Sequence, residues 1–265
     1  MLPFLKWAGG KRWLVQSGQL NVPSSYDRLV EPFLGGAAVF FSLEPARALL
    51  SDINPELIEA YHVVRDDPDR LKVVLEWHQE KHSREHYYEI RQKRYKDAVW
   101  RAARTLYLNR ACWNGLYRVN QRGEFNVPIG TKTRIIEHDE GFSEFANVLA
   151  KADIFCQDFE VTINNSGQGD FLFVDPPYTV KHNMNGFLKY NEAIFTWEDQ
   201  VRLRDSCVRA AERGAKVIVT NADHESVRQL YTDIADYSSI CRTSVLAGNA
   251  DYRTKTTEAV FRIIH

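Results

Sequence analysis

Hydrophobic and polar positions alternate along both ends of the chain in a way that predicts strands and helices in turn. Short apolar runs predict strands at residues 28–33, 48–52, 154–156, 171–174, 215–220, 240–246 and 258–263. Positions with a period near 3.6 predict helices between them at 37–43, 56–64 and 197–213. Strands that alternate with helices are typical of a doubly wound, mostly parallel sheet. The sequence therefore predicts an α/β fold.

The middle of the chain has a different pattern. Helical periodicity covers residues 69–79 and a longer run at 85–108, and a hairpin is predicted at 116–127, turning at Gln121-Arg122-Gly123. We interpret this part as a mainly helical insertion that carries a β-hairpin. The predicted domains are an insertion at 61–147 and a core domain formed by 1–60 together with 148–265.

Composition excludes several classes of protein. The 265 residues include 34 Lys and Arg against 35 Asp and Glu, so the net charge of −1 does not indicate a partner. No apolar run reaches the roughly 18–20 residues of a membrane span, and the first residues lack the features of a secretory signal. Four separated cysteines without a C-x-x-C pair favour free thiols in a reducing compartment. We therefore expect a cytoplasmic protein that does not contact a membrane.

Charge is unevenly distributed along the chain. Residues 84–134 contain twelve Lys and Arg but four Asp and Glu, so this segment is +8 and the rest of the chain is −9. A local excess of cations favours a polyanionic partner, and the aromatic residues interleaved with them could stack on bases. The alternative is a solvated helical face whose aromatic residues point to a core.

A hydrophobic strand at 171–174 leads directly into Asp175-Pro176-Pro177-Tyr178. Ligands of open α/β sheets bind at the carboxyl ends of the strands. The two prolines fix the backbone and remove donors, which leaves nearby carbonyls available as acceptors. A carboxylate, carbonyls and a flat ring suit a planar heterocycle that bears an exocyclic amine. The alternative is a turn with a structural tyrosine.

A second candidate site follows the strand at 28–33, where the sequence Glu31-Pro32-Phe33-Leu34-Gly35-Gly36 ends in a glycine turn. Such a turn lets a ligand approach the backbone and the start of the next helix. Asp52, at the end of the next strand, is placed to accept hydrogen bonds from ribose hydroxyls. The segment Phe4 to Lys11 combines two cations, an indole and a glycine pair, and it is either a flap over a nucleoside or a surface arm.

Three histidines are spaced so that one helix would align them on one side: His78, His82 and His86. Metal binding would require a further convergent ligand, and we identify none in the sequence. We therefore expect a solvated face and no metal.

These motifs together resemble the Dam-type DNA adenine-N6 methyltransferases, the D12 or alpha group with the D-P-P-Y motif. The matching segments are F-L-K-W-A-G-G-K at 4–11, E-P-F-L-G-G at 31–36, S-D-I-N at 51–54, L-N-R-A-C-W-N-G-L-Y-R-V-N-Q-R-G-E-F-N-V-P-I-G at 108–130 and D-P-P-Y at 175–178. The five segments occur in the family's order and extend over most of the chain. The resemblance implies a Rossmann-like S-adenosylmethionine-binding sheet with the insertion at 61–147 as target-recognition domain.

The resemblance also implies roles for particular residues. The catalytic set would be Asp175, Pro176, Pro177 and Tyr178, with Tyr178 stacked on an extruded adenine. The cofactor set would be Trp7, Lys11, Phe33, Gly35, Asp52, Asp158 and Asp175. The DNA-binding set would be Lys6, Trp113, Asn114, Leu116 and Arg118.

We therefore expect a monomeric enzyme that uses S-adenosylmethionine to methylate adenine N6 in double-stranded DNA, at GATC by resemblance, while associated with the nucleoid. Four alternatives stay open. The first is an adenine methyltransferase of a restriction system that recognises another short site. The others are a cytosine-N4 enzyme, an RNA methyltransferase and a catalytically silent DNA-binding regulator.

Overall fold

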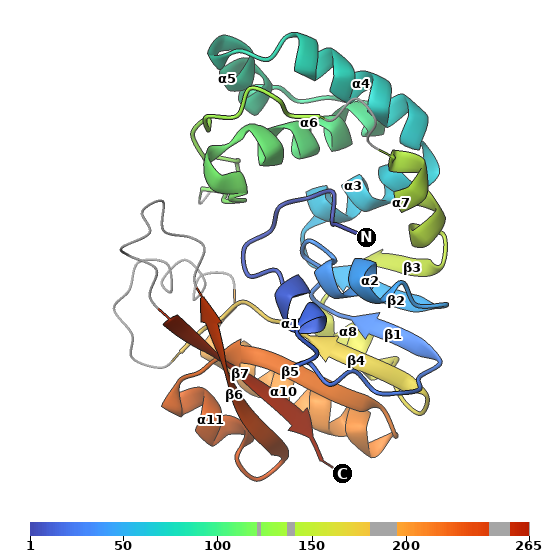
Figure 1. Ribbon diagram of the computed structural model, residues 1–265, viewed down its shortest axis with the longest axis vertical. Coiled ribbons are helices and arrows are strands. Elements are labelled where there is room, and N and C mark those ends of the chain that lie inside the picture. The colour runs from blue at the N-terminus through green and yellow to red at the C-terminus, as the bar shows by residue number, and fades with distance from the viewer. Residues whose placement is uncertain (121–122, 137–140, 181–194, 244–254, 265) are drawn as a thin grey trace. The chain divides into compact units, whose positions relative to one another are not determined.

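The computed structural model describes residues 1–120, 123–136, 141–180, 195–243 and 255–264. The chain forms two compact units (Figure 1). The first contains residues Met1–Gln16 and Leu34–Cys156, and the second contains Ser17–Phe33 and Gln157–His265. We describe each in turn.

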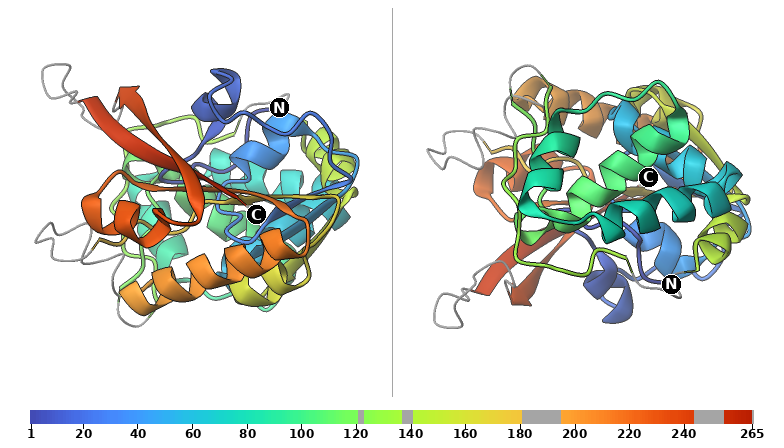
Figure 2. Two further views of the ribbon diagram at one scale, coloured as in Figure 1. Left: turned by 90° about the horizontal axis from the view of Figure 1, so that it is seen from below. Right: turned by 90° about the horizontal axis from the view of Figure 1, so that it is seen from above.

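The first unit combines two parallel strands with a set of helices. Its elements are α1 (Arg12–Gln16), α2 (Ala38–Leu43), β2 (Ala48–Asp52), α3 (Pro55–Asp66), α4 (Pro68–Glu80), α5 (Arg84–Gln92), α6 (Ala98–Ala111), a 3₁₀ turn η1 (Trp113–Gly115), α7 (Phe142–Leu149) and β3 (Ala152–Cys156). β2 and β3 pair in register from Ala48 with Ala152 to Asp52 with Cys156. Helix α3 packs on α6, α7 and β3, and α4 packs on α6 and α7 (Figure 2).

An aromatic core holds the N-terminal segment in the first unit. The Phe4 ring makes edge contacts with Phe41 of α2, Tyr61 of α3 and Phe145 of α7, with ring centres 5.1–5.8 Å apart. All four side chains are buried. Edge-to-face contacts of this kind add to the free energy of burial, so the start of the chain is part of the core.

The second unit contains five neighbouring strands in the order β1-β4-β5-β7-β6. Its elements are β1 (Arg28–Glu31), α8 (Phe159–Asn164), β4 (Asp170–Val174), α10 (Trp197–Glu212), β5 (Lys216–Ala222), α11 (Glu225–Tyr231), β6 (Ala235–Thr243) and β7 (Lys255–Ile263). β1, β4 and β5 are parallel, whereas β7 runs antiparallel to β5 and β6. The carboxyl ends of β1, β4 and β5 therefore lie at one edge of this sheet.

The predicted α/β, Rossmann-like fold is confirmed, but one predicted helix is wrong. The run at 85–108 is two helices, because Lys93 has an extended backbone (ψ 141°) and ends α5. The Asp97 side chain accepts a hydrogen bond from the Trp100 N–H and begins α6. Apolar periodicity continues through the break, which is why the pattern conceals it.

The strand predicted at 240–246 also differs from its predicted bounds. β6 begins at Ala235, five residues before the predicted start, and residues 244–246 of that prediction lie outside the described part. The predicted 116–127 hairpin is present as a bridge between Val119 and Phe125, with residues 121–122 of its turn outside the described part. No helix among the described residues is long and apolar enough to cross a membrane.

Candidate active site

The Asp-Pro-Pro-Tyr turn begins directly after β4 in the second unit. β4 is buried along its whole length, and Asp175, the residue that follows it, is partly exposed to solvent. The Thr220 hydroxyl of β5 donates to Asp175 Oδ1 at 2.7 Å. Because Thr220 is itself fully buried, this contact restrains the rotation of the carboxylate.

A buried amide pair holds the second proline. Gln200 of α10 donates from Nε2 to the Pro177 carbonyl at 3.3 Å, and its Oε1 accepts a hydrogen bond from Asn221 Nδ2 at 3.0 Å. The side chains of Gln200 and Asn221 are inaccessible to solvent. Buried polar groups are costly unless they are paired, so this chain of hydrogen bonds fixes the turn to the helix and the strand behind it.

The Tyr178 hydroxyl donates to Glu258 Oε2 of β7 at 3.3 Å. Burial raises the pKa of Tyr178 well above its ordinary value, and the nearby Asp175 and Glu258 carboxylates raise that pKa further. The phenol is therefore protonated at neutral pH and acts as a hydrogen-bond donor.

An aromatic group with an acidic neighbour lies elsewhere in the second unit. The Phe33 ring stacks on Phe159 at 5.3 Å and meets Phe195 edge-on at 5.6 Å. Asp158 caps α8 by accepting from the Glu160 N–H at 2.9 Å. Arg202 of α10 binds both Asp158 carboxylate oxygens at 3.0 Å and lies over the Phe159 ring. Burial acts to lower the Arg202 pKa, but the Asp158, Asp199 and Glu160 carboxylates together raise it above its ordinary value. The paired hydrogen bonds also orient the Asp158 carboxylate.

The glycine turn of the first unit is organised around Asp52. The Asp52 carboxylate accepts hydrogen bonds from the Gly35 and Asn54 N–H groups, both at 3.0 Å. Burial raises the Asp52 pKa, while these backbone donors act in the opposite direction. Gly35 has φ +47°, and a Cβ at this position would lie 2.8 Å from the Trp7 indole. Both the backbone and the indole therefore require glycine here.

The N-terminal segment is tied to helix α6 rather than free. Lys6 exchanges two hydrogen bonds with the Asn109 amide, at 2.9 Å and 2.7 Å. Arg110 donates to the Phe4 carbonyl at 2.8 Å. Lys11 is buried, and its Nζ donates to the Gly9 carbonyl at 2.6 Å. Because side chains far along the sequence satisfy this backbone, the segment is not a surface arm. Its placement over a nucleoside stays a prediction.

Trp7 has a second contact besides the glycine turn. Its ring stacks on Tyr117 at 4.9 Å with an interplanar angle of 22°. The Tyr117 hydroxyl in turn donates to Glu56 of α3 at 3.2 Å. The structure thus brings Trp7, Gly35 and Asp52 together and connects them to the 108–130 segment.

The 108–130 segment presents several of the predicted DNA-binding residues to solvent. The Trp113 indole is 53% exposed, Asn114 and Arg118 are also exposed, and Leu116 is half-buried. Asn114 adopts a left-handed conformation (φ 55°) that asparagine tolerates better than most residues.

The same segment is closed at its base and lies beside Lys6. The backbones of Cys112 and Ile129 form an antiparallel β-bridge, and the Gly130 N–H donates to the Ala111 carbonyl at 2.8 Å. A Cβ on Gly115 would lie 2.5 Å from the Lys6 side chain. Lys6 and the η1 turn are therefore in contact.

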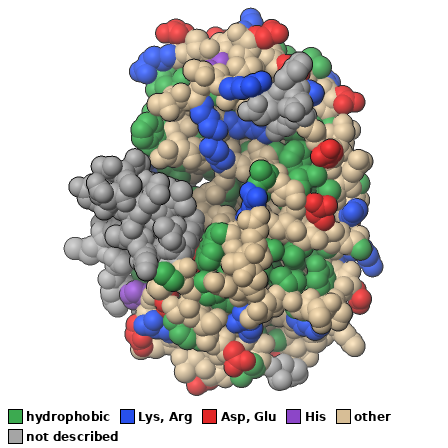
Figure 3. Space-filling view, viewed as in Figure 1, with side chains coloured by type: hydrophobic (Ala, Val, Ile, Leu, Met, Phe, Trp, Pro, Cys, Tyr) green, Lys and Arg blue, Asp and Glu red, His purple; other side chains and the backbone are tan. Residues whose placement is uncertain are grey.

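The basic segment at 84–134 is only partly a surface. Arg104 is buried and donates to the Ile90 and Arg91 carbonyls, where it caps the end of α5. Arg110 is buried as well. Among the residues of this segment that the structure describes, the exposed Lys and Arg side chains are Arg84, Lys93, Arg94, Lys96, Arg118, Lys132 and Arg134. Figure 3 shows several Lys and Arg side chains on the upper part of the visible face, where Figure 1 places α4, α5 and α6.

The three histidines do not form the expected solvated face of one helix. His78 lies in α4, His86 in α5 and His82 between the two helices, and His78 and His86 are buried. His78 Nδ1 is 3.1 Å from His86 Nε2, and the His78 ring stacks on Tyr107 of α6 at 4.7 Å. Burial lowers the His78 pKa to about 3. These residues pack three helices together.

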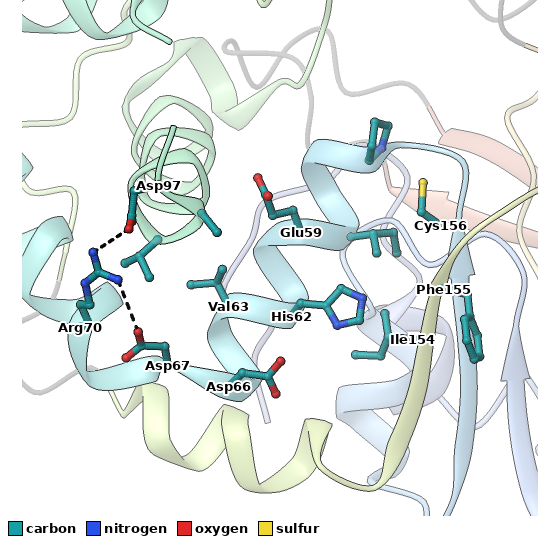
Figure 4. A pocket seen from close by; sticks show the side chains of 14 residues that line it. Glu59, His62, Val63, Asp66, Asp67, Arg70, Asp97, Ile154, Phe155 and Cys156 are labelled. Carbon is teal, nitrogen blue, oxygen red and sulfur yellow. Dashed lines mark hydrogen bonds and ion pairs between the residues drawn. The ribbon is translucent and has the colours of Figure 1, made fainter. Parts of the chain in front are cut away.

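A pocket of about 680 Å³ lies on the first unit between α3, β3 and the start of α6 (Figure 4). His62, Phe155 and Cys156 line it, and the Arg70 guanidinium binds Asp97 at 2.8 Å at its rim. None of the residues predicted to be functional lines this pocket. Within the described ranges, no group of three or more His, Cys, Asp and Glu side chains is arranged to hold a metal ion.

The sequence did not identify the four residues that hold the Asp-Pro-Pro-Tyr turn from behind: Gln200, Thr220, Asn221 and Glu258. The available signal was a polar residue at a position where the pattern of a helix or strand predicts an apolar one. That signal does not indicate which distant segment the side chain contacts.

The second unit thus places a carboxylate, two prolines and a tyrosine at the end of a parallel strand, the position at which open α/β sheets bind ligands. The family model of the D12 class N6 adenine-specific DNA methyltransferases matches residues 7–246. The chain belongs to this family, and it is an adenine-specific DNA methyltransferase.

Several curated relatives match almost the whole chain. The type II methyltransferase M1.LlaDCHI of Lactococcus lactis subsp. cremoris is 36% identical, over 97% of this chain and 94% of that protein. A DNA adenine methylase of Vibrio cholerae is 34% identical, over 96% and 93%. The DNA adenine methylase of Escherichia coli K12 is 32% identical, over 96% and 92%.

Proposed function

We propose that this enzyme transfers a methyl group from S-adenosylmethionine to N6 of an adenine flipped out of duplex DNA, and that its site is GATC. The observation that carries the proposal is the Asp-Pro-Pro-Tyr turn, whose Asp175 carboxylate and Pro177 carbonyl are each held by a buried side chain. The site sequence rests on the resemblance of the 108–130 segment to the Dam-type enzymes.

The chemistry requires alignment of the adenine amine more than a strong base. The amine lone pair is delocalised into the ring, which makes it a poor nucleophile. Hydrogen bonds from the two N–H groups to Asp175 and to the Pro176 carbonyl favour a pyramidal nitrogen, whose lone pair then faces the methyl group. Tyr178 stacks on the base, and Pro177 stiffens the turn. The protein thus contributes orientation and electrostatic stabilisation.

The cofactor assignments of both units belong to this proposal: Trp7, Lys11, Gly35 and Asp52 in the first, and Phe33, Asp158 and Asp175 in the second. The donor and acceptor chemistry fits S-adenosylmethionine, since Asp52 would accept from ribose hydroxyls and Asp158 from the adenine amine. An ionised carboxylate has about four acceptor positions, so each retains capacity beside the contacts described above. When bound, the cofactor supplies a methyl group on a positively charged sulfur.

The proposed DNA contacts come from side chains of the first unit, all exposed except the half-buried Leu116. Trp113 would wedge into the base stack, and Asn114 would help to hold the vacated position. Leu116 and Arg118 would contact neighbouring bases, and Lys6 would contact the outer guanine. An Arg that pairs with guanine in the major groove is the commonest specific contact, and Arg118 is exposed on the hairpin.

The organisation of the enzyme is proposed on the same basis. Residues 61–147 form the target-recognition domain, and residues 1–60 with 148–265 form the catalytic domain. The enzyme acts as a monomer on double-stranded DNA, either alone or beside a restriction endonuclease.

Methyl transfer from labelled S-adenosylmethionine to unmethylated plasmid DNA, followed by sequencing of the modified bases, tests this function. We expect N6-methyladenine confined to GATC. Methylation confined to another short motif would contradict the GATC assignment alone, and label in RNA but not DNA would contradict the substrate.

Asp175→Ala tests the catalytic assignment. The variant should lose methyl transfer and keep most of its affinity for DNA, because it removes an acceptor for the amine of the flipped adenine but none of the proposed contacts to phosphates or to neighbouring bases. Asp205→Ala on α10, whose carboxylate is 44% exposed in an ion pair with Arg204, is the matched control and should stay active.

A further inference from the structure

Glu258 is a carboxylate in the interior of a sheet, close to the catalytic turn. It lies on β7 opposite Ala222 of β5 and Ile240 of β6, and its side chain is 6% exposed. Burying an ionised carboxylate is costly unless hydrogen bonds compensate for lost water. A hydrophobic residue would fit the strand pattern at position 258. The packing of β7 therefore does not explain why this residue is a glutamate.

The contact of interest is the one with Tyr178. The phenol donates to Glu258 Oε2 at 3.3 Å, across 80 residues of sequence. At its other end, the tyrosine is joined to Pro177, whose carbonyl Gln200 holds. The ring is therefore restrained at its backbone by the α10 amide and at its hydroxyl by the β7 carboxylate.

We propose that Glu258 is a positioning residue that acts through the Tyr178 hydroxyl and sets the plane of the ring on which the target adenine stacks. The inference rests on the proposed function, in which Tyr178 stacks on the base. A ring held at both ends keeps the adenine amine aligned with Asp175, whereas a ring held at one end rotates about its side-chain bonds. Misplacement by about 1 Å can cost roughly a hundredfold in rate, so the effect should fall on turnover and not on substrate affinity.

A double-mutant cycle separates this role from a general effect on folding. Glu258→Leu and Tyr178→Phe should each lower kcat by about tenfold or more, with KM for DNA and for S-adenosylmethionine within twofold. In the Tyr178→Phe background, Glu258→Leu should have no further effect on kcat, because the hydroxyl through which it acts is gone. Glu258→Gln keeps an acceptor oxygen and should restore kcat to within about threefold of the wild type.

The exposed Glu212 at the end of α10 provides a matched control, and Glu212→Leu should leave kcat unchanged. Thermal melting monitors folding of every variant. If Glu258→Leu does not fold, the kcat of Tyr178→Phe tests the proposal by itself. An unchanged kcat in that variant would mean that anchoring of the Tyr178 hydroxyl has no role.

Independent effects of Glu258→Leu and Tyr178→Phe would overturn the positioning role while leaving the methyltransferase assignment intact. A folded wild-type enzyme that methylates no adenine would instead overturn the proposed function.

Discussion

At the scale of single residues, the catalytic turn depends on side chains that the rest of the sheet supplies. Asp175 and Tyr178 come from one short motif, but Thr220 and Glu258, which hold them, lie 45 and 80 residues further along the chain. Each of these contacts fixes a side chain whose direction matters for an in-line transfer. Substitutions behind the turn should therefore affect turnover even though the substituted residue does not touch the substrate.

Thr220→Val tests this directly. Valine keeps nearly the shape of threonine but lacks the hydroxyl that donates to Asp175 at 2.7 Å, so the carboxylate loses one restraint. We expect kcat to fall about tenfold with KM values unchanged, measured by single-turnover methyl transfer. Thr232→Val at the exposed end of α11 is the control, and an equal loss of kcat in both variants would contradict the role of Thr220.

Arg118→Ala tests the recognition of DNA sequence. Loss of an arginine that pairs with guanine should cost on the order of 1–3 kcal/mol of discrimination at one base pair. The measurement compares kcat/KM for the cognate site and for sites with single substitutions. Arg94→Ala, also exposed in the basic segment, should weaken all sequences equally; unchanged site preference for Arg118→Ala would contradict the assignment.

The residues proposed to carry the chemistry could be named from the sequence, whereas the side chains that contact them could not. Asp175 follows a continuous apolar run, and Gly35 follows another, so local pattern is sufficient to find both. Gln200 and Glu258 are single polar residues inside a helix and a strand. Their partners depend on how distant elements pack, and this information is absent from any short window of sequence.

At the scale of elements, the sequence predicted the ends of α2, α4 and α10 to within one residue but missed the break between α5 and α6. β2 coincides with its prediction because five consecutive residues are buried or nearly so. The break between α5 and α6 depends instead on capping: Arg104 supplies two hydrogen bonds to the last carbonyls of α5, and Asp97 begins α6. A buried arginine in α6 gives no local indication that it ends another helix.

The packing of α4, α5 and α6 makes stability depend on pH. The His78 pKa is about 3 in the folded protein, against about 6.5 when unfolded. Below pH 6.5 the unfolded chain binds a proton that the folded chain excludes, so the free energy of unfolding falls as pH falls from 6.5 toward 3. The decrease should approach about 1.4 kcal/mol per pH unit from this residue.

Urea denaturation between pH 7 and pH 5 measures this dependence. His78→Phe keeps a flat ring against Tyr107 and removes the titrating group, so its stability should change less over the same interval. A variant with the same slope as the wild type would show that His78 does not carry the effect.

At the scale of the whole molecule, local charge indicates function better than net charge does. The chain is −1 overall, while residues 84–134 are +8. The structure refines this count, because Arg104 and Arg110 are buried and bind carbonyls. The part of the charge available to DNA is therefore smaller than the sequence suggests, and only packing reveals which cations are exposed.

The salt dependence of DNA binding tests this surface. Affinity for non-cognate duplex should fall steeply with salt, because bound cations release counterions from phosphates. The double substitution Lys93→Gln with Arg94→Gln should reduce the slope of log K against log salt by about 2. Arg47→Gln removes an exposed cation outside the segment and is the control; equal slopes for both variants would contradict a specific basic surface.

If the proposed sites are correct, the position of the Trp7 indole links cofactor binding at the glycine turn with DNA binding at the 108–130 segment. One side of the ring limits the space at Gly35, and the ring also stacks on Tyr117 in the 108–130 segment. Any ligand that moves Tyr117 therefore changes the surroundings of the glycine turn. Linkage of this kind is reciprocal: the factor by which DNA alters affinity at the turn is the factor by which occupancy of the turn alters affinity for DNA. The affinity of either site therefore has to be measured at a stated occupancy of the other site.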